Sequence, residues 1–447
     1  VGVVNGSLAM VLAADGTTAL TASGVFFFAG GDFANATATL VTVNLNDSTT
    51  DYAVTPLTIA IDGVSATLAA AMNAKSVSVV GLAVDIAGFV SLSGDFGFRM
   101  TGAEIDADIE VAASNVSAKL AAGVFSVGVI NGSLAMVLAA DNSTAITASG
   151  TIFFQGGDFG TATATLVTVN LNDSTTDYAV TPLTIAIDGV SATLAAAMNA
   201  KSVSVVGLAV DIAGFVSLSG DFGFRMTGAD IEVAADQVSA QLGAGDFNVG
   251  VVNGSLAMVL AADGTTALTA SGVFFFAGGD FANATATLVT VNLNDSTTDY
   301  ATTPLTIAIG GVSADLNAGL NIQSVSVEGL AVDIAGFVSL SGDFGFRMTG
   351  ADIEVAADQV SAQLGAGDFN VGVVNGSLAM VLAADGTTAL TASGVFFFAG
   401  GDFANATATL VTVNLNDSAT DYAMTPLTIA IGGVSADLNA GLNIQSV

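Results

Sequence analysis

A segment of about 122 residues recurs almost unchanged along this chain of 447 residues. The decapeptide VGVVNGSLAM at Val1 returns as VGVINGSLAM at Val127, and again in its first form at Val249 and Val371, so the spacings are 126, 122 and 122 residues. Residues 249–325 and 371–447 differ at two of 77 positions. Repetition at a fixed period is typical of arrays in which each unit packs against its neighbours.

The repeat predicts four consecutive units, namely 1–126, 127–248, 249–370 and a partial unit 371–447. Because the sequence begins and ends inside a repeat, we interpret it as a window of a longer array. The first unit has four extra residues between Thr101 and Val127, where we expect a loop or a strand end. No Pro-rich or Gly-rich linker separates the units, which favours a continuous structure over tethered beads.

Within one unit, alternating apolar and polar residues indicate β-strands. TATLVTVNLND, residues 37–47, and PLTIAIDG, residues 56–63, both follow this period of two and are rich in β-branched residues. We expect about eight to eleven strands per unit. The Ala-rich piece 66–74 is an alternative short helix on propensity.

Short Asn-Gly and Asp-Gly pairs punctuate the strands. We expect turns at Asn5-Gly6, Asp15-Gly16 and Asp62-Gly63, with type I′ geometry because both central residues of that turn need a positive φ. In the second unit, Asn142-Ser143 stands where the first unit has Gly16-Thr17. Such turns join antiparallel strands, so the pattern favours a meander.

The predicted fold is all-β. We expect antiparallel meander strands stacked into an elongated, continuous, β-solenoid-like rod, and abutted β-sandwich beads are the alternative. The Phe residues of GVFFFAGGDF, residues 24–33, and GDFGF, residues 94–98, supply most of the bulk. They are expected to fill the core of each unit, and the alternative is that some face outward and join neighbouring units or chains.

The charge balance excludes several classes of partner. Lys and Arg total 6 against 39 Asp and Glu, so the net charge is −33. Without a cationic patch, binding to nucleic acid or to anionic lipid is disfavoured. The sequence has no Cys and no His, which excludes disulfides and thiolate or imidazole metal sites, and it has no apolar run long enough for a transmembrane helix.

No catalytic constellation is recognisable in the sequence. There is no His base, no Cys nucleophile, no GxSxG elbow and no phosphate-binding loop with its lysine. The aspartates stand mostly in predicted turns, where an Asp is usually a turn former. We therefore expect a protein that is not an enzyme and has no catalytic residues.

One acidic loop has the composition of a calcium site. NLNDSTTDY, residues 44–52, gathers amide and carboxylate oxygens, which are the ligands that calcium prefers on a bendable loop. The alternative is that these residues only form Asx-turns. The predicted calcium ligands of the four units are Asp47, Asp51, Asp173, Asp177, Asp295, Asp299, Asp417 and Asp421.

The repeated blocks GFVSLSGDFGFRMTG and GVSATLAAAMNAKSVSVVGLAVDIAG resemble the giant tandem-repeat cell-surface proteins of bacteria, which are described as adhesin-like or hemagglutinin-like. The likeness covers the whole sequence and rests on repetition and composition. It implies an extracellular or cell-surface location and a role in attachment or in surface fibres. It carries no catalytic or binding residue across to this chain.

Two kinds of function fit these observations. The first is a structural repeat region of an extracellular filament or surface stalk, whose partners are copies of itself along or across a fibre. The second is a multivalent adhesin that binds glycans or other cells through avidity. A surface-layer protein is a further alternative.

Overall fold

The structure, a computed structural model, describes residues 1–31, 34–101, 107–402 and 404–447. It divides into two compact units. One contains residues 1–210 and 224–227, and the other contains residues 211–223 and 228–447. The sequence expectation of a loop or strand end at the four extra residues of the first repeat falls largely on residues 102–106, which lie outside the described residues.

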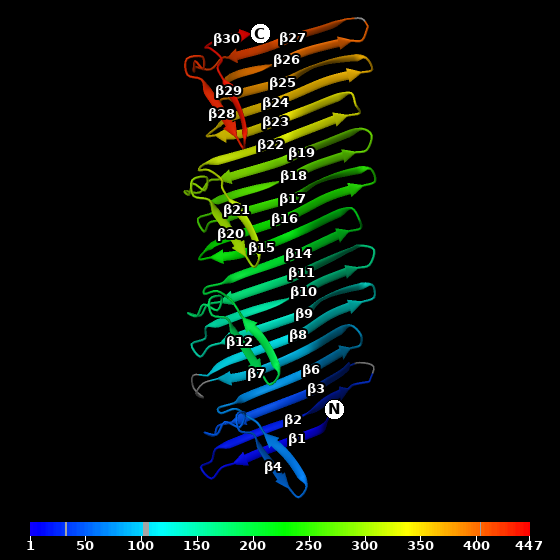
Figure 1. Ribbon diagram of the computed structural model, residues 1–447, viewed down its shortest axis with the longest axis vertical. Helices are drawn as coiled ribbons and strands as arrows, with labels where there is room; N and C mark the ends of the chain where they lie inside the picture. The colour runs from blue at the N-terminus through cyan, green and yellow to red at the C-terminus, as the bar shows by residue number, and fades with distance from the viewer. Residues whose placement is uncertain (32–33, 102–106, 403) are drawn as a thin grey trace. The chain divides into compact units, whose positions relative to one another are not determined.

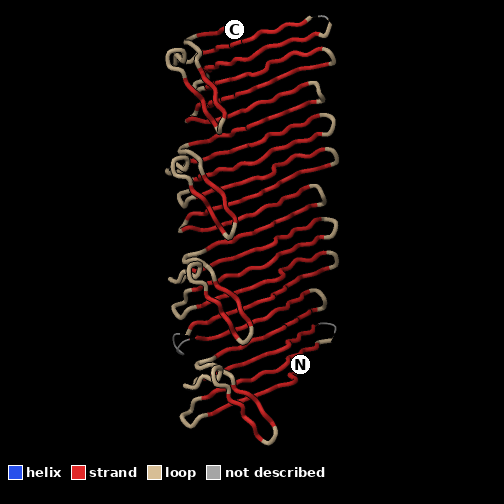
Figure 2. Tube along the Cα trace, in the orientation of Figure 1, coloured by secondary structure: helices blue, strands red, loops and turns tan. Residues whose placement is uncertain are grey.

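Every regular element of the described residues is a β-strand (Figure 2). The first repeat contains β1 (Gly2–Leu12), β2 (Thr18–Ala29), β3 (Ala34–Asn46), β4 (Leu57–Ile61), β5 (Val64–Leu68), β6 (Lys75–Ile86), β7 (Val90–Thr101) and β8 (Asp108–Ala122). The second contains β9 (Phe125–Leu138), β10 (Thr144–Gly156), β11 (Gly160–Asn172), β12 (Leu183–Ile187), β13 (Val190–Leu194), β14 (Lys201–Ile212), β15 (Val216–Thr227) and β16 (Asp230–Ala244). The third contains β17 (Phe247–Leu260), β18 (Thr266–Gly278), β19 (Ala282–Asn294), β20 (Leu305–Ile309), β21 (Val312–Leu316), β22 (Ile322–Ile334), β23 (Val338–Thr349) and β24 (Asp352–Ala366). The last contains β25 (Phe369–Leu382), β26 (Thr388–Gly400), β27 (Asn405–Asn416), β28 (Leu427–Ile431), β29 (Val434–Leu438) and β30 (Ile444–Ser446).

Of the strands in the described residues, twenty-two form a long antiparallel meander sheet, and the other eight form two-stranded hairpins. Each complete repeat therefore has eight strands, six in the meander and two in a hairpin, which is within the expected range. The prediction of an all-β, antiparallel meander fold is confirmed. The alternative helix at residues 66–74 is wrong, because β5 occupies its start and the alanines that follow, Ala70 and Ala74, are buried against the sheet.

Successive repeats are joined by strand pairing. In the first unit the last strand of repeat 1, β8, pairs antiparallel with β9 of repeat 2. In the second unit β16 pairs with β17 and β24 pairs with β25 in the same way. Abutted β-sandwich beads are therefore not the architecture at these junctions, because the backbone hydrogen bonds of the sheet run across the repeat boundary.

The predicted chain reversals at Asp15-Gly16 and Asp62-Gly63 are confirmed, but type I′ geometry is found only at Asp62-Gly63. Asp62 and Gly63 both have positive φ, 48° and 85°, and connect β4 to β5 as a two-residue type I′ turn. Between β1 and β2 only Gly16 has a positive φ, and its N–H donates to the Ala13 carbonyl at 3.0 Å in a longer loop. In the second repeat Asn142, with φ 69°, takes the place of Gly16.

The Asn5-Gly6 pair is not a turn but a β-bulge inside β1. Asn5 has a φ of 54°, and the pairing with β2 shifts by one residue between Val4 and Ser7. Asn tolerates this left-handed conformation better than most residues, which is why it serves at a bulge as well as at a turn. Equivalent bulges occur at Asn131, Asn253 and Asn375.

An aspartate holds two neighbouring bulges together. The Asp95 carboxylate on β7 accepts a hydrogen bond from the backbone N–H of Gly81 on β6 at 2.7 Å. It accepts a second from the side-chain amide of Asn115 on β8 at 2.8 Å. Gly81 and Asn115 both have positive φ, so Asp95 satisfies the Gly81 N–H that the bulge removes from the regular ladder and ties it to the Asn115 side chain at the next bulge.

The buried apolar core lies between the hairpins and the sheet. Its largest fully buried side chains come from the hairpins, with Leu68, Ile185, Ile187 and Leu194 all at most 2% exposed. The prediction that Phe residues fill the core is wrong for those described: Phe27 and Phe98 are 40% and 48% exposed, and Phe33 lies outside the described residues. The short hairpin side chains occupy the place that the sequence assigned to the aromatic rings.

Candidate assembly site

Each hairpin lies across long strands of the sheet. Figure 1 shows the hairpin that contains β12 crossing β7, and β12 and β13 contact strands from β6 to β10. Strands β6 to β8 belong to the first repeat, whereas the hairpin belongs to the second. The hairpin therefore docks backward onto the preceding repeat.

The first hairpin shows what this docking contributes. Ile187 and Val190, at the tip of the second hairpin, are 2% and 0% exposed. Their counterparts in the first hairpin, Ile61 and Val64, are 66% and 74% exposed, because in this chain no strands equivalent to β6–β8 lie beneath them. Since burying such a side chain contributes about 1.5–3 kcal/mol, two of them supply about 3–6 kcal/mol of coupling between repeats.

A glycine on β7 allows the hairpin to pack closely against the sheet. A Cβ atom at Gly97 would lie 2.9 Å from the Cβ of Ile187, which is closer than packed side chains approach. Gly345 and Ile431 repeat the relationship at 2.7 Å. The glycine of GDFGF is therefore required by the close approach of the hairpin and not by a turn.

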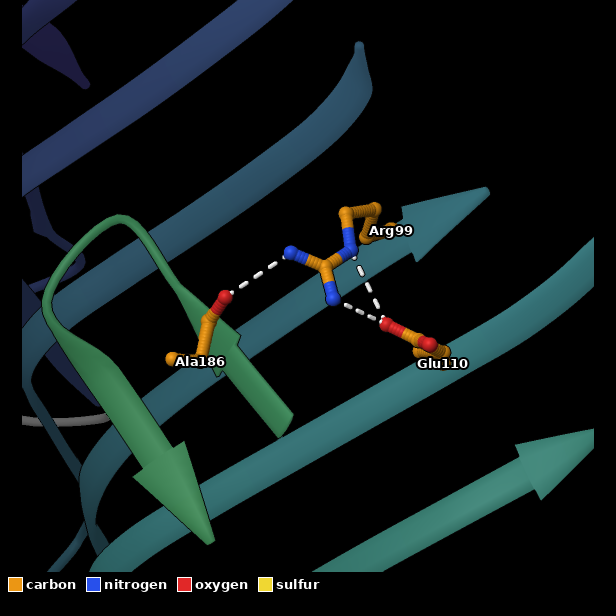
Figure 3. Close-up of polar contacts among 3 residues, drawn as sticks. All are labelled: Arg99, Glu110 and Ala186. Carbon is orange, nitrogen blue, oxygen red and sulfur yellow. Dashed lines mark hydrogen bonds and ion pairs between the residues drawn. The ribbon is translucent and has the colours of Figure 1, made fainter. Parts of the chain in front are cut away.

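An arginine joins the sheet to the hairpin (Figure 3). Arg99 on β7 donates from Nε to Glu110 Oε2 on β8 at 2.9 Å, and its Nη2 forms an ion pair with the same oxygen. Its Nη1 donates to the carbonyl oxygen of Ala186 on β12 at 2.9 Å. Glu110 is 13% exposed and Arg99 33%, so the pair is partly shielded from water.

The geometry of the hairpin explains why the Ala186 carbonyl is available. Ile187 and Val190 flank the two-residue turn, so they form the hydrogen-bonded pair that closes it. The next pair, Ala186 with Ser191, is a non-hydrogen-bonded pair, whose carbonyls point away from the partner strand. The guanidinium of Arg99 satisfies this outward carbonyl.

The same clamp recurs in the second unit. Arg347 Nε donates to Glu354 Oε2 at 2.8 Å, and Arg347 Nη1 donates to the Ala430 carbonyl on β28 at 3.1 Å. Arg99 and Ala186 are 87 residues apart in sequence, whereas Arg347 and Ala430 are 83 apart. The difference equals the four extra residues of the first repeat, so this insertion does not disturb the clamp.

The turn of the second hairpin reaches still further along the preceding repeat. The Asp188 carboxylate accepts a hydrogen bond from the side-chain amide of Asn44 on β3 at 2.9 Å and another from the Ser76 hydroxyl on β6 at 3.0 Å. In the hairpin of the last repeat this aspartate is replaced by Gly432, where a Cβ would lie 2.1 Å from the Ser326 hydroxyl oxygen. The tip thus contacts the preceding strands through a carboxylate in one case and through close backbone approach in the other.

The proposed calcium ligands accept hydrogen bonds from nearby backbone. Asp47 accepts from the Thr18 N–H, and Asp51 accepts from the Ala53 N–H at 3.0 Å. Asn46, the last residue of β3, is fully buried and donates to the Thr50 and Ala70 carbonyls. The same contacts recur at the equivalent carboxylates, which are Asp173, Asp177, Asp295, Asp299, Asp417 and Asp421.

This loop organises the base of the hairpin through Asx-turns. Among the described residues, no three Asp or Glu side chains gather in a way that could hold a metal ion. Calcium binding stays a prediction, and a thermal melt distinguishes the two interpretations. A chelator lowers the melting temperature if calcium bridges the loop, whereas it leaves the melting temperature unchanged if the Asx-turns alone hold it.

The residues that join the repeats were not singled out by the sequence. Arg99, Glu110, Gly97 and Asp188 carry the docking of the hairpin, and none of the four was predicted as a site residue, although Gly97 and Arg99 lie in the repeated GDFGFRMTG block. One signal was present: the only three arginines of the chain stand at the same position of each GDFGFRMTG block. In a chain with so few cations, a fixed arginine indicates a specific anionic or carbonyl partner.

Comparison with known proteins adds no relative, since no family model, no curated protein and no solved structure matches this chain. In the part of the chain that the structure describes, no helix has the length and apolar character needed to cross a membrane. The arrangement of the site therefore carries the functional argument.

Proposed function

We propose that this chain is a structural repeat region of an extracellular filament or surface stalk, with a mechanical role and no catalysis. The observation that carries the proposal is the docking of each later hairpin on strands of the preceding repeat, secured by the Arg99–Ala186 contact. Such docking adds a nearest-neighbour term for every repeat, so stability grows with repeat number. A stalk or fibre gains length from each added copy in the same way.

The location is part of the same proposal. The resemblance to giant tandem-repeat surface proteins of bacteria supports an extracellular setting, where a long stable array serves attachment or a surface fibre. The near identity of the repeats also supports a structural role, because every copy must present the same hairpin to its neighbour.

Electron microscopy and fibre diffraction of the full chain test the proposal. Six meander strands per repeat, spaced about 4.8 Å apart, predict an axial repeat of about 29 Å in a filament. Filaments with that period support the structural role. Discrete molecules that bind glycans or cells would instead support a multivalent adhesin, and a two-dimensional lattice would support a surface-layer protein.

A further inference from the structure

The face of the sheet opposite the hairpins exposes apolar side chains in both units. Side chains alternate between the two faces of a strand, so the residues that contact the hairpins fix the identity of each face. Ala9, Ala19 and Ala135 pack on the hairpins, as do Arg99 and Glu110. Their neighbours in sequence therefore point to the opposite side, which we call the open face.

Two cross-strand rows show the composition of the open face. The strand registers align one row as Met10, Leu20, Leu45, Lys75, Met100 and Ile109. They align the second as Leu8, Ala22, Val43, Val77, Phe98 and Val111. Only Lys75 is charged, and it is replaced by Gln323 in the third repeat. The chain carries 39 acidic residues, and none stands in these rows.

The open face is hollowed at the same place in different repeats. In the first unit, Val43, Val77 and Phe98 line an open apolar depression. In the second unit, Val291, Val325 and Phe346 line its counterpart. Each unit therefore has the same hollow at the equivalent position of its repeat.

The exposed area is large enough for a stable interface. Eight side chains of the first repeat are between 36% and 59% exposed on this face, namely Leu8, Met10, Val43, Leu45, Val77, Phe98, Met100 and Ile109. With about 150–200 Å² for a fully exposed side chain of this size, they present on the order of 600 Å². Soluble monomers seldom expose a larger contiguous patch than about 300–600 Å². Two such surfaces in contact bury about 1,200 Å² for a pair of first repeats, which reaches the range of specific interfaces.

We propose that the open face packs against the open face of a second copy of this chain, so that two sheets stack about 10 Å apart with an apolar layer between them. A second copy matches the face in two respects. It has the same repeat period, so the hollows lie at equivalent positions of its repeats, and it brings no carboxylate into these rows. An anionic membrane is disfavoured as the occupant because the net charge of −33 is repelled from it.

This pairing rests on the proposed function, since it identifies the surface through which copies associate across a fibre. The opposite face supplies a matched control. There, beyond the hairpins, the polar side chains Asp85, Ser91 and Lys119 stand in register on β6, β7 and β8.

Sedimentation of the full chain over a range of micromolar concentrations tests the pairing. The test variant carries Val77→Asp, Val203→Asp and Val325→Asp, which place three charges on the open face. The control carries Ser91→Asp, Ser217→Asp and Ser339→Asp, which place the same three charges on the other face. We expect wild type and control to be dimers, and the open-face variant to associate about 100-fold more weakly, because six carboxylates, three from each copy, are desolvated in the paired state.

The pairing is overturned if the wild type is a monomer, or if the test and control variants associate equally. It is also overturned if the wild type floats with phosphatidylcholine vesicles and the open-face variant does not, because a lipid surface would then be the partner. If the Asp variant does not fold by circular dichroism, Val→Thr at the same three positions gives the answer with strand propensity retained. Filaments that persist in the open-face variant would support the proposed function and overturn the pairing. Dimers that never form filaments would support the pairing and contradict the proposed function.

Discussion

The guanidinium of Arg99 donates to the carbonyl oxygen of Ala186 at 2.9 Å, across 87 residues of sequence and across a repeat boundary. The same arginine holds Glu110, which is only 13% exposed. One side chain thus connects two strands of the sheet to the hairpin of the next repeat.

Replacing this arginine is expected to loosen the hairpin. Arg99→Lys keeps the charge but loses the planar fork that reaches Glu110 and Ala186 together, so we expect a loss of about 1–3 kcal/mol in the local free energy of unfolding. Hydrogen exchange of the β12 and β13 amides measures it. Lys119→Met, which removes an exposed charge from β8, is the control. Equal protection in both variants would show that the clamp contributes nothing.

The close packing of the hairpin on Gly97 predicts that a larger side chain at this position destabilises the protein. In Gly97→Ala the new methyl lies 2.9 Å from Ile187 Cβ, so the hairpin must shift, at an expected cost of about 1–3 kcal/mol. Gly243→Ala is the control, because its nearest neighbour is 3.8 Å away and the first repeat has Ala121 at this position. Urea denaturation compares the two variants, and an unchanged midpoint for Gly97→Ala argues against close seating.

Comparing the second hairpin, which is docked, with the first, which is not, measures how much apolar burial contributes to the free energy of unfolding. Ile187→Ala empties a buried site and should cost about 2–5 kcal/mol. Ile61→Ala makes the same change at a position that is 66% exposed, so we expect less than about 1 kcal/mol. Hydrogen exchange of each hairpin reports the change locally, and equal losses would contradict docking onto the preceding repeat.

The paired bulges depend on Asp95. Asp95→Ala removes the acceptor for Gly81 N–H and for the Asn115 amide, so we expect about 1–3 kcal/mol of destabilisation. Asp95→Asn retains one acceptor oxygen and should lose less. Thermal melting ranks wild type, Asp95→Asn and Asp95→Ala by melting temperature. If Asp95→Ala melts at the same temperature as wild type, this carboxylate does not stabilise the bulges.

The β1–β2 loop should respond to acid. Hydrogen bonds from the Thr17 N–H and hydroxyl hold the pKa of Asp15 below its ordinary value, and Thr265 and Thr387 do the same for Asp263 and Asp385. A lowered pKa means that the charged form stabilises the folded loop. This contribution is present above the unfolded pKa of about 3.9 and is lost as the pH falls through the lower folded value.

The Thr17 amide proton reports this titration by NMR. We expect its chemical shift to change with a midpoint below that of an Asp in an unfolded peptide, and we expect the change to vanish in Asp15→Asn. A midpoint at the ordinary value would show that the hydrogen bonds do not persist in solution.

Local conformational preferences made part of the fold predictable. The alternation of apolar and polar residues in segments rich in β-branched residues predicted the strands, and Asp62-Gly63 predicted a type I′ turn. Both predictions depend on dihedral angles that neighbouring residues prefer. Asn5-Gly6 has the same preference for positive φ but serves as a bulge. A dipeptide determines which dihedral angles are accessible, and only the pairing of β1 with β2 decides whether the chain reverses there.

The repeat, the shortage of cations and the strand content were thus determined by the sequence itself. Only the tertiary structure decided that hairpins fill the core, that Phe98 faces outward and that Arg99 meets Ala186. These outcomes depend on strand register between segments far apart in the chain. A shift of one residue in register moves every side chain to the other face, and no local pattern in the sequence specifies the register across 87 residues.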